Sequence, residues 1–257
     1  MTDGSNSNGP RLALITGGGR RIGRAIAIAL SRAGYTVVLH ANRSRDDAEK
    51  VAADINAARG RASVVLADLE DHDAVQGLIP AASAFGALTL LVNNAGVFEQ
   101  DEIANLARAN FERAMAVNLT APLFLAQAFA AQTPAGANAS IVNIVDQRVL
   151  KPTPLFFSYA ISKAALHSAT TMLAQALAPK LRVNAVAPGP TLPSPRQSEA
   201  QFAAQAATMP LDRGPSPEDI AAAVLYLAQA PSVTGVTIAV DGGQHLAWRT
   251  ADSDMPE

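Results

Sequence analysis

Tyr159 and Lys163 are four positions apart in the run Tyr-Ala-Ile-Ser-Lys, and Asp146 precedes them at the end of an apolar run. Side chains four apart share one face of a helix, so the lysine ammonium can lower the pKa of the phenol. A phenol of lowered pKa is a usable proton donor near neutral pH, which is the chemistry of redox enzymes. A carboxylate hydrogen-bonded to that phenol can orient it, recharge it, or hold a water that supplies the proton.

These residues need a scaffold, and short apolar runs that alternate with helix-length segments predict one. Such alternation implies parallel strands joined by right-handed crossovers, with helices on both faces of the sheet. We therefore expect an α/β fold with a doubly wound parallel sheet of about seven strands. The expected strands are Leu12–Thr16, Val37–His40, Val64–Ala67, Leu88–Asn93, Ile141–Val145, Val183–Val186 and Thr237–Val240.

A glycine-rich turn at 16–23 lies between the first expected strand and a helix with an apolar stripe. Gly34 is expected to end that helix in a left-handed conformation. Glycines let the backbone approach a pyrophosphate, and a helix N-terminus presents free N–H groups to it. The turn therefore predicts dinucleotide binding. The residues expected to take part are Gly17, Arg20, Arg21 and Ile22.

The end of the second expected strand favours NADPH over NADH. No Asp or Glu stands at 40–44 to bind an adenosine ribose, whereas His40, Arg43 and Ser44, together with Arg20, offer donors and positive charge to a 2′-phosphate. The alternative is that these residues are a solvated surface. Asp68 and Leu69, after the third strand, are expected at the adenine, unless Asp68 only caps the next helix.

Composition excludes other classes of function. The chain has 257 residues, 49% of them hydrophobic, enough for one core, and a formal charge of −2 that attracts neither nucleic acid nor anionic membrane. It has no cysteine and four scattered histidines, so no metal site is expected. With no apolar run near the roughly 18 residues that span a bilayer, we expect a soluble, cytoplasmic protein.

One domain is expected over 11–248, between a disordered polar tail at 1–10 and a polar C-terminal tail at 249–257. Prolines interrupt the chain between 188 and 217, after the sixth expected strand. A long segment there can form a lid over the substrate, at about 190–215, or a passive surface loop.

Together these motifs resemble the classical short-chain dehydrogenase/reductase family over about residues 11 to 247. The resemblance rests on the glycine turn, Asn93-Asn94-Ala95-Gly96, Asn118, Tyr159 with Lys163, and Pro188-Gly189. It implies a single Rossmann-type domain and, commonly, a homotetramer. It also implies that Asn94, Ala95, Pro188, Gly189 and Thr191 contact the cofactor, with Lys163 on the nicotinamide ribose and Asn118 in the proton path.

Several departures from the classical pattern resemble one branch, the pteridine reductases and the bacterial dihydromonapterin reductases. They are Arg21 in the turn, His40 with Arg43 and Ser44, Phe98, Asp146 in place of a serine, and Thr191. In that branch the matching aspartate and tyrosine are catalytic, and the matching phenylalanine stacks on the pterin. A flat pterin suits a slot beside an aromatic face, and Arg21 can hydrogen-bond the pterin while it neutralises phosphate.

The sequence thus predicts an NADPH-dependent reductase of a dihydromonapterin, dihydrobiopterin or dihydrofolate type of pterin. Asp146, Tyr159, Lys163 and Asn118 are the expected catalytic residues. Arg21, Phe98, Asp146 and Tyr159 are those expected at the substrate. Two alternatives stay open: a carbonyl or 3-oxoacyl reductase that uses NADPH, and a non-catalytic NADP-binding regulatory protein.

Overall fold

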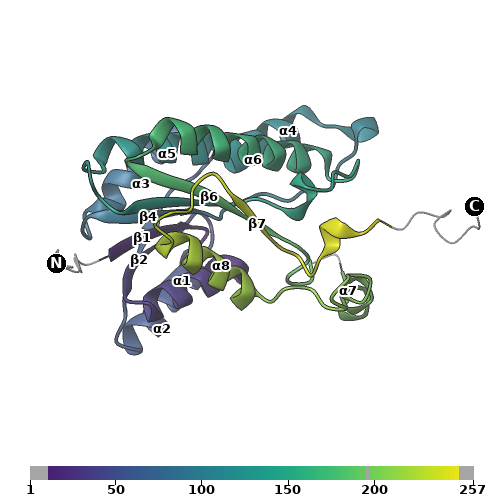
Figure 1. Cartoon of the computed structure of the whole chain (residues 1–257), viewed down its shortest axis with the longest axis horizontal. Helices are drawn as coiled ribbons and strands as arrows, with labels where there is room; N and C mark the ends of the chain where they lie inside the picture. Colours follow the sequence, from purple (N-terminus) through teal and green to yellow (C-terminus); the bar gives the residue numbers. More distant parts are fainter. Residues whose placement is uncertain (1–10, 195–196, 249–257) are drawn as a thin grey trace, which may run out of the picture.

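The computed structural model describes residues 11–194 and 197–248. The tails expected at 1–10 and 249–257 lie outside the described residues. The described chain forms one α/β unit in which a central sheet separates two layers of helices (Figure 1).

The sheet has seven strands in the order β3-β2-β1-β4-β5-β6-β7, and every pair is parallel. This is the expected fold, with a change of winding direction between β1 and β4, where doubly wound sheets bind ligands. All seven expected strands are present, with ends that differ by a few residues. Their bounds are β1 Arg11–Thr16, β2 Tyr35–Ala41, β3 Arg61–Leu66, β4 Leu88–Asn93, β5 Ala139–Ile144, β6 Leu181–Pro188 and β7 Thr237–Val240.

The helices form a layer on each side of the sheet (Figure 1). One layer contains α1 (Arg21–Arg32), α2 (Arg45–Ala57) and α8 (Pro217–Gln229), and the other contains α3 (His72–Ser83), α4 (Arg108–Met115), α5 (Ala121–Gln132) and α6 (Phe157–Leu177). A short helix, α7 (Glu199–Ala206), stands apart from both layers, near the carboxyl end of the sheet.

The first helix shows how the apolar pattern builds the core. Ile26 and Leu30 are fully buried on one face of α1, which packs against β2 and against α8. Gly34 follows the helix with φ +86°, the left-handed conformation expected from the sequence. The carboxyl ends of β1 and β2 are thereby fixed beside the start of α1.

One helical stretch corrects an expectation. Arg108–Gln132, which joins α4 and α5 through a π-helical turn, is long and apolar enough, by length and composition alone, to cross a membrane. The expectation that no segment has this length and character was therefore wrong. The stretch nevertheless packs against α3, β4 and α6, and Leu125 and Phe129 on it are fully buried. It is apolar because it covers one face of the sheet.

The segment after β6 contains α7, which the sequence did not predict. Ser198 caps this helix by accepting from the Gln201 backbone N–H, and the Gln201 side chain accepts from the Ser198 N–H. The helix lies within the stretch expected to form a lid.

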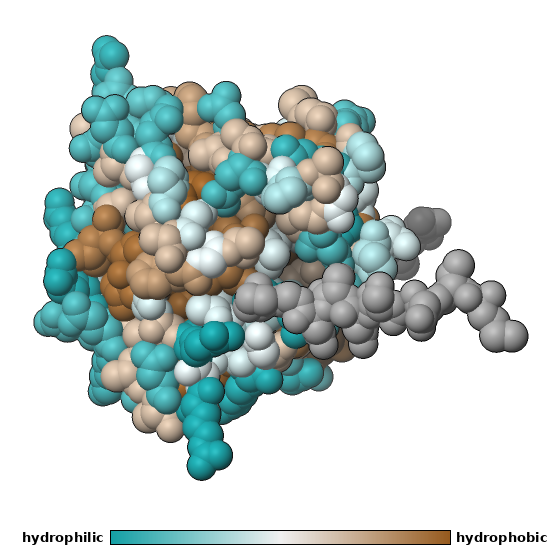
Figure 2. All heavy atoms as spheres, turned by 90° about the vertical axis from the view of Figure 1, so that its left-hand side faces the viewer, coloured by the Kyte–Doolittle hydropathy of each residue, from teal (hydrophilic) through white to brown (hydrophobic). Residues whose placement is uncertain are grey.

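The opposite, amino-terminal edge of the sheet faces the viewer in Figure 2. Apolar side chains reach the surface there in one area that polar side chains border. Asp146, Tyr159 and Lys163 belong to the other edge, where β5 ends.

Candidate active site

The candidate site lies where β4, β5 and β6 end. Because parallel strands end at one edge of the sheet, residues that follow them in sequence come together there. Asn93 ends β4 and Ile144 ends β5, and their register places Asn93 beside Asn143. A hydrogen bond of 2.9 Å from Asn93 Nδ2 to Asn143 Oδ1 joins the two strands just below the site.

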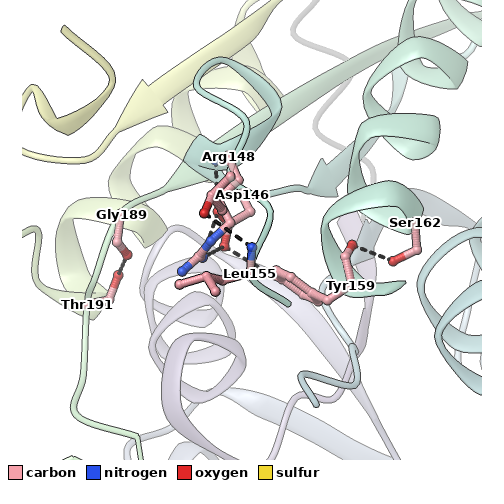
Figure 3. Close-up of polar contacts among 8 residues, drawn as sticks. Asp146, Arg148, Leu155, Tyr159, Ser162, Gly189 and Thr191 are labelled. Atoms are coloured by element: carbon pink, nitrogen blue, oxygen red, sulfur yellow. Dashed lines mark hydrogen bonds and ion pairs between the residues drawn. The ribbon is translucent and has the colours of Figure 1, made fainter. Parts of the chain in front are cut away.

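Asp146 and Tyr159 meet directly. The phenol donates to Asp146 Oδ2 over 2.9 Å, from the first turn of α6 to the segment that follows β5 (Figure 3). The Asp146 side chain is 14% exposed, so water reaches this pair poorly. The expected hydrogen bond between carboxylate and phenol is therefore present.

The electrostatics of Tyr159 differ from the expectation. Burial first, and then the charge and hydrogen bond of Asp146, raise the pKa of the Tyr159 phenol well above 10, while Arg148 opposes the rise. The idea that Lys163 makes this phenol acidic is wrong for the protein without ligands. Burial and the adjacent carboxylate raise the pKa of the phenol more than Arg148 lowers it, so Tyr159 keeps its proton.

Lys163 lies one helical turn from Tyr159 and is 3% exposed. Its Nζ donates to the Ile144 carbonyl oxygen over 2.7 Å and lies 5.9 Å from the centre of the Tyr159 ring. Burial lowers the pKa of Lys163 to about 8, although the Asp146 charge opposes that change. A Cβ at Gly96 would be in ordinary contact with Nζ, at 3.6 Å, but in tight contact with Asn118 Oδ1, at 3.2 Å.

Asn118 occupies the π-helical turn Ala116–Thr120 and is fully buried. Its amide accepts from Val97 N–H at 2.9 Å and donates to the Val97 carbonyl at 3.0 Å and to Ser162 Oγ at 3.0 Å. These bonds join the loop after β4 to α6. A π turn exposes helix polar groups to such uses and is frequent at functional sites.

Phe98 is half-exposed at the mouth of the site. Its ring stacks on Phe156, with 4.3 Å between centres and 13° between planes, and meets the Tyr159 ring edge-on at 4.7 Å. Such rings form a flat apolar surface next to the proton donor. The expected neighbourhood of Phe98 and Tyr159 is thus present, and Phe156 is an addition to it.

Sequence reasoning missed Phe156, Arg148 and Asp101. Phe156 precedes α6 with φ +56°, which is rare for a bulky residue and is found at functional sites. Arg148 lies within 3.2 Å of both Asp146 oxygens. Buried Asp101 binds the Ser158 hydroxyl and its N–H, the latter at 3.1 Å, and so fixes the start of α6. Arg148 and Asp101 could have been found from the sequence, because each is a charged residue close to a predicted site residue, Asp146 and Phe98 respectively.

The glycine turn packs closely against the start of α1 and against the residues that follow β4. Gly17 has φ +64°, and a Cβ on Gly23 would lie 2.1 Å from the Gly17 carbonyl oxygen. Asn94 Nδ2 donates to the carbonyls of Thr16 and Gly17, and Thr16 Oγ1 accepts from the Asn94 and Ala95 N–H groups. Because no side chain caps the first N–H groups of α1, they are available to an anion.

His40 corrects another expectation. It is 2% exposed, its Nδ1 accepts from Gly17 N–H at 3.2 Å, and its Nε2 lies 3.1 Å from the Ala67 carbonyl oxygen. Burial lowers the pKa of His40, so the ring is neutral and both nitrogens are used within the protein. It supports the glycine turn and does not offer a free donor or a charge to a 2′-phosphate.

The other residues expected at the cofactor range from exposed to buried. Arg20 forms an exposed ion pair with Asp47 of α2, a partner not expected from the sequence, and Arg43 is exposed beside partly buried Ser44. Ile22 is partly buried at the start of α1, Leu69 is buried, and Asp68 accepts from the Glu70 N–H at 3.0 Å.

Arg21 contacts the segment after β6, and Thr191 belongs to that segment. Arg21 has φ +48°, and its guanidinium donates to the carbonyls of Leu192 and Pro193, at 3.0 Å each. Thr191 Oγ1 donates to the Gly189 carbonyl at 2.9 Å, just past Pro188 (Figure 3). Arg21 therefore ties the glycine turn to the expected lid, and the structure does not bring its side chain to Asp146.

The model of the family described as enoyl-(acyl carrier protein) reductase matches residues 18–245 of the chain. The chain belongs to the short-chain dehydrogenase/reductase family. It is an oxidoreductase of that family, and the Rossmann-type fold and the resemblance expected from the motifs are confirmed.

Three relatives illustrate the range of the short-chain dehydrogenase/reductase family. The crystal structure of FolM alternative dihydrofolate reductase 1 from Brucella canis, complexed with NADP, is 48% identical, with a TM-score of 0.91 over 94% of this chain and 96% of that one. A short-chain type dehydrogenase/reductase from Picea abies is 34% identical, covering 92% and 93% of the two chains. 3beta-hydroxysteroid dehydrogenase 1 from Eggerthella lenta is 33% identical, covering 92% and 94%.

Proposed function

We propose that this short-chain reductase uses NADPH to reduce a C=N bond of a pterin, of the dihydromonapterin, dihydrobiopterin or dihydrofolate type. The observation that carries the proposal is the 2.9 Å hydrogen bond between Tyr159 and Asp146 beside the ring of Phe98. The similarity to the Brucella canis FolM dihydrofolate reductase supports it.

The cofactor proposal is NADPH, which would supply the hydride when bound. The close glycine turn and the uncapped start of α1 suit a pyrophosphate, and Arg43 and Ser44 follow β2 without a carboxylate among residues 40–44. The structure with NADP from Brucella canis supports the same choice. Lys163 would hold the nicotinamide ribose, near Asn94, Ala95 and the Pro188–Thr191 segment.

The residues at the substrate explain the preference for a ring nitrogen. Reduction of C=N requires a hydride at carbon and a proton at nitrogen, and Tyr159 holds a proton that its raised pKa keeps in place. After donation the phenolate would stand beside the Asp146 carboxylate, so this pair suits a basic acceptor such as an imine nitrogen. Phe98 offers a face on which a flat heteroaromatic can stack.

A carbonyl reductase is the second candidate. It is favoured by the similarity to 3beta-hydroxysteroid dehydrogenase 1 and by the Tyr159 and Lys163 pair, which serves carbonyls as well as imines. Asp146 argues against it, because a carboxylate next to a developing oxyanion repels it, whereas a hydroxyl donates to it. A cofactor-binding protein without catalysis is the third, and the connected Tyr159, Lys163 and Asn118 argue against it.

The test is steady-state NADPH oxidation with dihydromonapterin, dihydrobiopterin and dihydrofolate. A 3-oxoacyl thioester and a 3-ketosteroid serve as the carbonyl substrates for comparison. We expect turnover with at least one pterin and slower turnover with the carbonyls. Rapid ketone reduction without pterin turnover would replace this proposal with the second candidate. Tight NADPH binding without any turnover would favour the third.

Two proposals concern the whole molecule. We propose a homotetramer, which sedimentation of the purified protein will test, and a cytoplasmic location, which fractionation of the producing cells will test. Neither bears on the chemistry above.

A further inference from the structure

We propose that Arg148 is a positioning residue of the reaction, which holds the Asp146 carboxylate aimed at the Tyr159 hydroxyl. The inference rests on the proposed function, since it assigns a role within the same proton path. Arg148 has no counterpart among the motifs read from the sequence.

The hydrogen bonds of Arg148 to Asp146 come from both its side chain and its backbone. Its Nη1 lies 3.2 Å from both carboxylate oxygens, and its backbone N–H donates to Oδ1 at 2.9 Å. Oδ2 also accepts from Tyr159, so Arg148 and Tyr159 together engage both oxygens of the carboxylate (Figure 3). A carboxylate with both oxygens engaged has little freedom to rotate away from the phenol.

Aromatic rings confine the guanidinium. Its central carbon lies 5.3 Å from the centre of the Phe156 ring and 5.6 Å from that of Phe98, within the range of cation–π attraction. The side chain is only 21% exposed. Arg148 therefore joins the proposed stacking surface to the proton donor, so that a ring stacked on Phe98 would meet both.

The position of the Arg148 side chain is not explained by a hydrogen bond from its Nε. Within residues 11–194 and 197–248, this N–H is buried and has no hydrogen-bond partner. A buried donor without a partner costs free energy, and such costs are tolerated at functional sites. The ion pair with Asp146 is the interaction that compensates for it.

The charge balance of the proposed reaction gives the cation its task. Tyr159 Oη gives its proton to the substrate nitrogen as hydride reaches the neighbouring carbon, and solvent later returns a proton to the phenolate. Between these steps a phenolate would stand beside the carboxylate to which the hydroxyl donates, over 2.9 Å, in this structure. The charged and titratable groups that face Asp146 in the described chain are Arg148, Tyr159 and Lys163, and the guanidinium is the one in contact with both carboxylate oxygens.

The experiment compares Arg148→Gln, which removes the charge, with Arg148→Lys, which keeps it. Arg108→Gln is the control, because it breaks an exposed arginine–carboxylate pair, with Glu112, on α4. For each full-length protein, kcat and KM for NADPH-dependent reduction of dihydrobiopterin are measured from about pH 5 to about pH 9. Ligand-free crystal structures of the wild type and Arg148→Gln are compared as well.

We expect Arg148→Gln to lose about 10- to 100-fold in kcat with little change in KM. Arg148→Lys should recover most of the rate, and Arg108→Gln should match the wild type. In the crystal of Arg148→Gln, Asp146 should leave the Tyr159 hydroxyl.

A loss of kcat in Arg148→Gln that Arg148→Lys does not recover would overturn the inference and leave Arg148 a merely structural residue. So would a crystal structure of Arg148→Gln with the Asp146–Tyr159 bond intact. Failure of the proposed function is distinguishable, because the wild type itself would then not turn over dihydrobiopterin. The crystallographic comparison would still decide the role of Arg148 in that case.

Discussion

Lys163 Nζ is bonded to the carbonyl oxygen of Ile144, the last residue of β5, which fixes the ammonium inside the protein at the end of the sheet. Burial, opposed by Asp146, lowers its pKa to about 8 from the ordinary lysine value of 10.5. Below pH 8 the folded and unfolded states are both protonated, and the buried charge destabilises the fold. Between about 8 and 10.5 the unfolded state binds more protons, so stability rises with pH.

The wild type should therefore gain about 2 to 3 kcal/mol in free energy of unfolding, relative to Lys163→Met, between about pH 7 and about pH 10. Urea denaturation of both proteins at the two pH values measures the difference. Because Met carries no charge, other titrating groups cancel in the comparison. A constant difference between the two proteins would mean that the ammonium is not desolvated as the structure implies.

Asp146→Ser separates the two enzymatic candidates. For pterin reduction we expect the rate to fall about 100-fold, because the proton donor loses its partner, while NADPH affinity stays nearly unchanged. For a carbonyl reductase the same exchange should be tolerated or should raise activity, because a hydroxyl suits an oxyanion. The measurements are kcat with a dihydropterin and with a ketone, and the Kd of NADPH from fluorescence titration.

Phe98→Ala should raise KM for a dihydropterin about tenfold, because the stacking face is lost, and should affect NADPH binding little. Phe98→Tyr keeps an aromatic face and should stay close to the wild type. Phe85→Ala is the matched control, since Phe85 is a similarly exposed phenylalanine just past the end of α3. Equal KM values for Phe98→Ala and Phe85→Ala would contradict a stacking role.

His40 makes the glycine turn sensitive to acid. Burial lowers its pKa, so the folded protein keeps it neutral while the unfolded chain takes up a proton below about pH 6.5. Stability is thus lost as pH falls through this range. His40→Gln retains an acceptor and a donor but does not titrate, so between about pH 7 and about pH 5 the wild type should lose about 1 to 2 kcal/mol relative to it. Thermal denaturation at both pH values checks this, and parallel curves would speak against it.

The elements with a regular pattern could be predicted, and so could the residues fixed by them. Each strand was visible as an apolar run, and the meeting of Asp146 with Tyr159 follows from β5 and α6 being neighbours at one edge of the sheet. Arg148 and Phe156 lie on the irregular chain between those elements, where no period indicates direction. Phe156 also has a positive φ, which residue type argues against.

The errors have a common cause in burial. His40 has a polar side chain near the end of a strand, and residue type alone suggested a ligand-binding donor. The structure instead turns the ring inward between Gly17 and Ala67. Likewise, the spacing of Tyr159 and Lys163 says that they are neighbours, but the balance of desolvation and charge on the phenol depends on what surrounds both. The pKa of such a phenol can be argued only when the groups that surround it are known.

The π-helical turn at Ala116–Thr120 gives the helix one residue more than a regular α-helix would hold there. That surplus residue rotates everything beyond it by about 100°. Removal of a single residue in the turn would therefore re-phase α5 against α4, and Asn118 could no longer hold the Val97 loop while Leu125 and Phe129 stay in the core. The contacts of Asn118 with the loop and the burial of α5 in the core thus depend on the same number of residues. Deletion of one residue would disrupt one or the other.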